Sequence, residues 1–194
     1  MKHLSWLLLF IFAAISCVGA QSKSAKKPLK VWESTDLKGK KAILLAGKSP
    51  KVTALLFITP DCPISNAYAP DWNALCKAYT SKHIAFYTVY VATDAPTKEI
   101  QKHYRDFQYT CPALIDRKHV LAKRVGATIT PESVVLSQRG KILYQGRIDD
   151  RFIDFGIKRY APKAHDLRNA LDEITQGKRV TVSKTKAVGC FISN

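Results

Sequence analysis

The sequence has few acidic residues for its number of basic ones. It carries 15 aspartates and glutamates against 31 lysines and arginines, which gives a formal net charge of +16 at pH 7. No zinc-finger spacing, recognition-helix pattern or aromatic-rich RNA motif accompanies the charge, so it does not indicate a nucleic-acid-binding protein. The basic side chains are scattered among apolar segments and indicate a solvated surface, with attraction to an anionic membrane surface or an acidic partner as the alternative.

Long apolar runs are also missing. The run at residues 6–15 is too short for a membrane span, which needs about 20 apolar residues. It follows a basic start and precedes the small residues VGA at 18–20, as in a secretory signal peptide. We therefore predict a signal peptide over residues 1–20, a flexible lysine-rich leader over 21–30, and export to the periplasm or the medium. Cys17 leaves open the alternative of a bacterial lipoprotein that carries its lipid on this cysteine.

Cysteine is scarce, and its use is not fixed by the count. Removal of the signal peptide leaves Cys62, Cys76, Cys111 and Cys190. Four cysteines allow two structural disulfides in an exported chain, but a domain of about 170 residues does not need them to fold. Redox chemistry therefore remains open. The length suits one domain, which we place at residues 31–177, followed by a C-terminal tail at 178–194 that carries Cys190.

Apolar patterning predicts alternating strands and helices. Strands are predicted at 52–58, 84–92 and 113–115, helices around 72–79 and at 97–107, 120–125 and 165–175, and a hairpin with strands at 133–136 and 142–144. The order βαβαβαββα predicts an α/β sandwich with a mixed, mostly parallel sheet that helices flank.

Cys62 stands where such folds build their sites. It lies between the end of the predicted strand at 52–58 and the start of a helix. Unpaired backbone N–H groups and the helix dipole favour a thiolate at such a junction, which lowers the thiol pKa. We predict that Cys62 is the reactive nucleophile.

Several segments together point to a family. The segment TPDCPIS at residues 59–65 lies between a strand and a helix, and ITPE at 129–132 leads into a strand-turn-strand. Further segments are YQGRIDDRF at 144–152, AHDLRNALD at 164–172 and KAVGCFI at 186–192. Over residues 30–192 the chain resembles the thioredoxin-like superfamily, and within it the exported redoxin group related to alkyl hydroperoxide reductase and thiol-specific antioxidant proteins.

The resemblance implies a thioredoxin-like domain and a redox activity. Pro131 would be a cis-proline that faces the reactive sulfur, and Thr130 would pair with an extended substrate peptide. Thr59, Pro63 and Ser65 would complete the substrate site. The implied activity is that of a thiol-disulfide oxidoreductase, which acts on a protein or small-molecule thiol or disulfide, uses an external thiol reductant and needs no cofactor or metal.

The sequence departs from thioredoxin at Ser65, where thioredoxin has a second cysteine. A lone thiol cannot resolve the mixed disulfide that it forms. Cys76 lies on the apolar helix face and is predicted to be a core residue, and Cys111 precedes a strand whose start lies at the opposite sheet edge. Cys190 follows Gly189 in a tail that can fold back over the domain, so we predict it as the resolving thiol. The alternative is a tail thiol that is idle or that bonds another protein.

Two rival functions remain open. Thr59 stands three residues before Cys62, as in the peroxidatic motif of peroxiredoxins. However, Leu55 replaces the proline of that motif, and Thr130-Pro131 replaces an arginine that would orient a peroxide. Copper delivery needs a CxxxC pair and a distant histidine, which this chain lacks around Cys62. The histidines at positions 83, 103, 119 and 165 show no ligand spacing and are predicted to be surface or packing residues.

Overall fold

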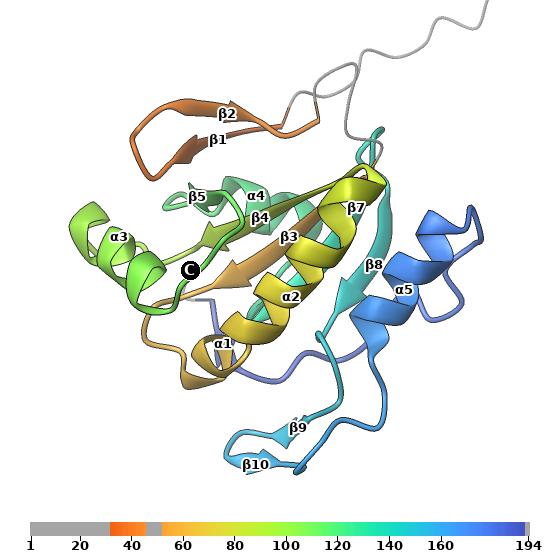
Figure 1. The fold of residues 1–194 in the computed structure, drawn as a ribbon. Helices are drawn as coiled ribbons and strands as arrows, with labels where there is room; N and C mark the ends of the chain where they lie inside the picture. Colours follow the sequence, from red (N-terminus) through yellow and green to blue (C-terminus); the bar gives the residue numbers. More distant parts are fainter. Residues whose placement is uncertain (1–31, 46–51, 193–194) are drawn as a thin grey trace, which may run out of the picture.

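A computed structural model describes residues 32–45 and 52–192 of the chain (Figure 1). The predicted signal peptide, the leader and Cys17 lie outside these residues. None of the helices in the described ranges is long and apolar enough to cross a membrane. The strands are β1 (Glu33–Asp36), β2 (Lys41–Ile43), β3 (Val52–Ile58), β4 (Ile84–Tyr90), β5 (Ala113–Ile115), β6 (Ile129–Thr130), β7 (Glu132–Ser137), β8 (Ile142–Gly146), β9 (Phe152–Asp154), β10 (Ile157–Lys158) and β11 (Cys190–Phe191). The helices are α1 (Pro63–Ala67), α2 (Ala69–Tyr79), the 3-10 turn η1 (Thr80–Lys82), α3 (Thr97–Asp106), α4 (Val120–Val125) and α5 (Asp166–Thr175).

Strand β3 lies inside a seven-stranded sheet of order β2-β1-β5-β4-β3-β7-β8. All seven of its residues are buried, as expected for an apolar run that is covered on both faces. Ala54, Leu56 and Ile58 point into one core layer, and the alternating Leu55 and Phe57 point into the other.

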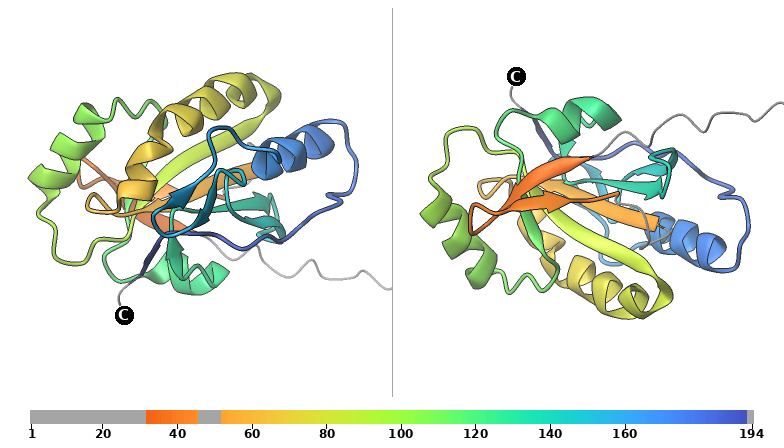
Figure 2. Two further views of the ribbon diagram at one scale, coloured as in Figure 1. Left: turned by 90° about the horizontal axis from the view of Figure 1, so that it is seen from below. Right: turned by 90° about the horizontal axis from the view of Figure 1, so that it is seen from above.

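The two core layers are covered by different helices. Helices α2, α3 and α5 pack on the layer that contains Trp72, Ile100 and Leu167. Helix α4 packs on the opposite layer through Leu121 and Val125. Figure 2 shows α4 on one side of the sheet and α2 and α5 on the other. The α/β sandwich predicted from the sequence is confirmed.

The sheet is mixed, with a smaller parallel part than the sequence indicated. Strands β3, β4 and β5 are parallel, while β3–β7, β7–β8, β1–β5 and β1–β2 pair antiparallel. The extra antiparallel pairs come from the hairpin β1–β2, which the sequence analysis did not include. Its strands are short and half exposed, so they carry no long apolar run that could have predicted them.

The C-terminal segment crosses the domain after α5. It first follows β8, where Gln145 N–H donates to Ser183 O at 2.9 Å and Thr185 N–H donates to Gln145 O at 3.0 Å. It then reaches the loop before β7, where β11 pairs antiparallel with β6. This path brings the end of the described chain to the segment that contains Pro131.

Candidate active site

Cys62 lies in the turn between β3 and α1. Its N–H donates to Thr59 O at 3.3 Å, and its carbonyl accepts the N–H of Asn66 at 3.1 Å. Cys62 is the residue before the first turn of α1, and Pro63 occupies that turn, where its missing N–H costs no hydrogen bond. The strand-to-helix position predicted for Cys62 is therefore confirmed.

The Cys62 thiol is fully buried and contacts two segments distant in sequence. Its relative exposure is 0%. The thiol donates to Thr130 O at 3.0 Å, and the Cys190 thiol lies 2.8 Å from the Cys62 sulfur, toward which it donates. The Thr130–Pro131 peptide bond is cis, as the resemblance implied. The structure thus brings together Cys62, Thr130, Pro131 and Cys190.

The tail reaches Cys62 as a short β-strand. Cys190 is paired with Thr130, and Phe191 with Ile129. Thr130 Oγ1 donates to Cys190 O at 3.3 Å, and Ile192 N–H donates to Thr128 O at 2.9 Å. The tail therefore occupies the edge of β6 that the resemblance assigned to a substrate peptide.

The two thiols of the pair ionise very differently. Burial opposes ionisation of Cys62, but hydrogen bonds from Cys190 and from the hydroxyl and backbone of Ser65 outweigh it and lower the Cys62 pKa. Burial, the hydrogen bond to Cys62 and the charges of Cys62 and Asp61 raise the pKa of Cys190 to about 12. Cys62 is therefore the thiol that becomes a thiolate first, which is what a nucleophile requires.

The remaining predicted site residues line the same turn. The Ser65 hydroxyl is buried and has no hydrogen-bond partner among the described residues, so its proton is available to a Cys62 thiolate. Pro63 is exposed beside Cys62, and Thr59 contributes its carbonyl to the turn.

A partly buried row of hydrogen bonds behind the turn was not found from the sequence. Asn66 Nδ2 donates to Pro60 O at 2.9 Å, His103 Nε2 lies 2.8 Å from Asn66 Oδ1, and Tyr90 Oη lies 2.9 Å from His103 Nδ1. Because Asn66 Oδ1 is an acceptor, His103 Nε2 carries the proton and Tyr90 donates to Nδ1. Burial lowers the pKa of His103, which favours this neutral form. These hydrogen bonds hold Asn66 in place, and Asn66 in turn fixes the Pro60–Cys62 turn through the carbonyl of Pro60.

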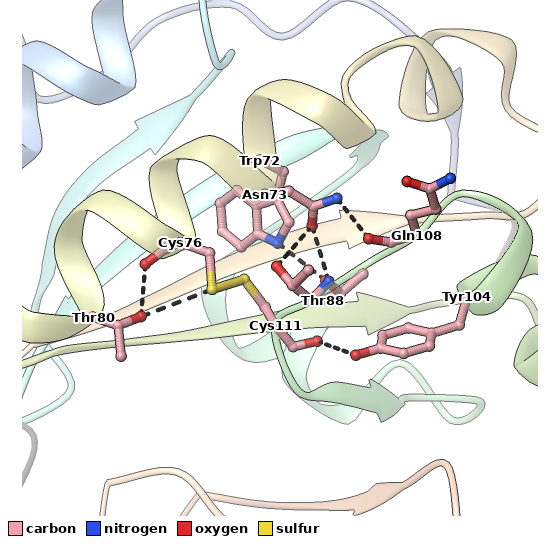
Figure 3. Close-up of a disulfide and its surroundings, with 9 residues drawn as sticks. Trp72, Asn73, Cys76, Thr80, Thr88, Tyr104, Gln108 and Cys111 are labelled. Carbon is pink, nitrogen blue, oxygen red and sulfur yellow. Dashed lines mark hydrogen bonds between the residues drawn. A yellow bond between two sulfur atoms is a disulfide. The ribbon is translucent and has the colours of Figure 1, made fainter.

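The other two cysteines form a disulfide. Cys76 in α2 is bonded to Cys111, with Cα atoms 6.2 Å apart (Figure 3). Asn73 lies one helical turn before Cys76 and holds the segment just before Cys111 by hydrogen bonds. Its side chain donates to Gln108 O at 2.8 Å and accepts the N–H of Thr110 at 3.0 Å.

Cys76 is the core residue that the sequence predicted, and it has a disulfide partner that the sequence did not predict. The residue is buried, as predicted, but it is also covalently paired, because Cys111 lies beneath the same helix face. Periodicity shows which face of a helix is buried but not which distant residue meets it. Cys62 and Cys190 are the free cysteines of the described residues.

Comparison with known proteins identifies the family of the chain. A model of the AhpC/TSA family matches residues 18–145. The chain belongs to the AhpC/TSA family. The match includes Cys62, Thr130 and Pro131, whereas Cys190 lies beyond it. No curated protein sequence matches the chain significantly.

Solved structures share the fold at low sequence identity. An uncharacterized conserved protein from Geobacillus kaustophilus is 22% identical with a TM-score of 0.73, and the alignment covers 87% of this chain and 90% of that one. A hypothetical protein from Sinorhizobium meliloti 1021 is 21% identical with a TM-score of 0.71, over 84% and 91% of the chains. A thiol-disulfide oxidoreductase from Bacteroides fragilis is 19% identical with a TM-score of 0.53, over 61% and 89% of the chains.

Proposed function

We propose that this AhpC/TSA family member is an exported thiol-disulfide oxidoreductase in which Cys62 is the nucleophile and Cys190 is the resolving thiol. The main support is the 2.8 Å approach of the two free sulfurs beside Thr130 and Pro131. A disulfide between Cys76 and Cys111 supports export, because such bonds persist in oxidising compartments.

The proposed reaction consists of two exchanges. The Cys62 thiolate attacks a substrate disulfide, forms a mixed disulfide with one half and releases the other half as a thiolate. The Cys190 thiolate then attacks the Cys62 sulfur, forms the Cys62–Cys190 disulfide and releases the second half. Substrate gains two electrons that the cysteine pair loses. An external thiol reductant returns the pair to the dithiol form.

The ionisation of the pair supports this order of events. With Cys62 charged, the pKa of Cys190 is about 12, partly because of the hydrogen bond to Cys62 and the Cys62 charge. Once Cys62 is in a mixed disulfide, neither contribution remains, so Cys190 ionises more easily. The resolving thiol thus becomes more nucleophilic after the first exchange.

Peroxide reduction has less support at this site. The hydrogen bonds that lower the Cys62 pKa come from Cys190 and Ser65, which are uncharged. Thr130 and Pro131 stand where a peroxidatic site would have an arginine. We therefore propose a protein or small-molecule disulfide as the substrate.

A turnover assay tests the proposal. Reduction of a mixed-disulfide peptide by a thiol reductant should be lost in Cys62→Ser. In Cys190→Ser the first exchange should persist, and the mixed disulfide should accumulate on Cys62, where mass spectrometry detects it. The double variant Cys76→Ser/Cys111→Ser, assayed where it is folded, is the control and should retain turnover. Full activity of Cys62→Ser, or faster turnover with hydrogen peroxide than with the disulfide, would overturn the proposal.

A further inference from the structure

The tail closes the proposed site. Cys62 has no exposed surface, and its sulfur faces Thr130 O on one side and the Cys190 thiol on the other. No external disulfide can approach a sulfur in this position. The site must open before the first exchange, and the tail is the segment that covers it.

The tail covers the site in the manner of a bound peptide. Residues 190–191 pair with β6 through main-chain hydrogen bonds, and Cys190 stands opposite Thr130. Proteins that bind extended peptides at a strand edge use the same main-chain pairing, with side chains adding specificity. Here the peptide belongs to the chain itself, and its cysteine stands at the reactive sulfur.

Gly189 allows the tail to come this close. A Cβ atom built on Gly189 would overlap the carbonyl oxygen of Thr130 and would lie 2.7 Å from its carbonyl carbon and 3.1 Å from Pro131 Cδ. These are mostly backbone atoms, which cannot turn away as a flexible side chain can. The backbone of Gly189 does not have a positive φ, so close approach alone accounts for the glycine.

The tail is anchored separately upstream of this strand. The Thr185 hydroxyl accepts the N–H of Arg147 at 3.1 Å and lies 2.8 Å from Tyr144 Oη. Thr185 also packs against Gly146 so closely that a Cβ there would overlap it. Residues 186–192 can therefore leave β6 while Thr185 keeps Cys190 near the site.

We propose that residues 189–191 compete with the substrate of the proposed function for the edge of β6 at Thr130, so that the tail keeps the site closed until an extended, disulfide-bearing polypeptide displaces it. A substrate strand that follows the path of the tail needs glycine immediately before the cysteine that Cys62 attacks. This inference rests on the proposed function and adds to it a sequence requirement on the substrate and a means of control.

Peptide binding without redox chemistry tests the competition. The probe is a fluorescein-labelled peptide with the sequence of residues 186–192 and serine in place of Cys190, added to the reduced full chain. In Gly189→Ala the tail should bind β6 poorly, so the probe should bind about tenfold more tightly or better. Gly156→Ala is the control for a glycine-to-alanine change away from the site: its φ of 79° strains an alanine locally, but no described atom lies within 4 Å of a Cβ at that exposed turn, so probe binding should not change.

Two further arms complete the experiment. A probe with alanine in place of its glycine should bind about tenfold more weakly, and oxidation of the Cys62–Cys190 pair should reduce probe binding because it locks the tail. Equal affinity of the parent and Gly189→Ala, equal affinity of the two probes, or no binding to any variant would overturn the inference. Because the probe cannot react, such a result leaves the turnover assay of Cys62→Ser as an independent test of the proposed function.

Discussion

At the scale of single residues, Ser65 tests how the site favours a thiolate. Its buried hydroxyl has no hydrogen-bond partner among the described residues, and its donation to the Cys62 thiolate lowers the Cys62 pKa. Ser65→Ala should therefore raise that pKa, because the thiolate loses a charge-assisted hydrogen bond. The pH dependence of alkylation of Cys62, followed by peptide mapping, measures the shift.

Thr53 provides a matched control for Ser65. Its hydroxyl is also buried and makes no hydrogen bond to a described residue, but it lies near the start of β3, whereas Cys62 follows the end of this strand. Thr53→Ala should leave the alkylation profile of Cys62 unchanged. If both variants shift the profile equally, the effect of Ser65 is one of packing and not of hydrogen bonding.

His103 predicts a pH dependence of stability. Burial lowers its pKa below the ordinary value, so as the pH falls the unfolded chain binds a proton at this residue at a higher pH than the folded chain does. The contribution of the neutral ring to the free energy of unfolding is complete above the pKa of the unfolded state, about 6.5. It is lost as the pH falls through the pKa of the folded state. Urea unfolding between pH 4 and 8 should show this loss.

The matched variants separate His103 from the other titrating groups. His103→Gln removes the titration and should flatten the decline in the free energy of unfolding below about pH 6.5. His165→Gln changes an exposed histidine and should retain the decline. A parallel decline in all three proteins would show that other groups cause it.

The residues of the site differ in how far the sequence reveals them. Cys62, Thr130, Pro131 and Cys190 stand in recognisable segments, and the structure places all four in contact. The hydrogen-bond network of Asn66, His103 and Tyr90 has no recognisable sequence segment of this kind. Its members come from α1, α3 and β4, and only the packing of these elements makes three polar side chains into one network.

At the scale of elements, segments with a clear apolar pattern were predictable, and strands too short to carry such a pattern were not. Strand β3 and helices α4 and α5 begin and end within one residue of their predicted positions. Strands β6 and β11, of two residues each, exist because they pair with each other, and the hairpin β9–β10 likewise has no strong pattern of its own. Local sequence cannot predict a strand whose stability comes from a distant partner.

The Cys76–Cys111 disulfide should stabilise the fold without taking part in catalysis. It closes a loop of 35 residues between α2 and the start of β5. On the chain-entropy model, its loss in Cys76→Ser/Cys111→Ser should lower the free energy of unfolding by about 4 kcal/mol, and urea denaturation of the oxidised proteins measures this. The parent unfolded in the presence of a reductant is the control. An unchanged midpoint would show that the two cysteines are not bonded in solution.

At the scale of the whole molecule, the tail joins parts of the fold that are far apart in sequence. It pairs with Gln145 of β8, places Ala187 among the buried residues and ends against β6. The sheet edge at β8 is thereby partly covered, which limits its pairing with other chains. The same segment carries the proposed resolving thiol, so the site is complete only when the tail is packed against β8 and β6.

Oxidation of the Cys62–Cys190 pair should therefore stabilise the entire domain. The two cysteines are separated by 128 positions, and their disulfide would close most of the domain into one ring. Such a loop restricts the unfolded chain by roughly 5 kcal/mol on the entropy model, before any native strain is subtracted. Mildly oxidised protein should melt at a higher temperature than protein in which only this pair is reduced.

Two variants decide whether this pair causes the shift. Cys190→Ser keeps the Cys76–Cys111 disulfide and should lose the difference between the two redox forms. Cys76→Ser/Cys111→Ser should melt at lower temperatures in both redox forms but keep the difference between them, because its remaining pair still closes the large ring. If Cys190→Ser melts like the oxidised parent under both conditions, the tail stabilises the domain by packing alone. Cys62 would then need a resolving thiol from another molecule.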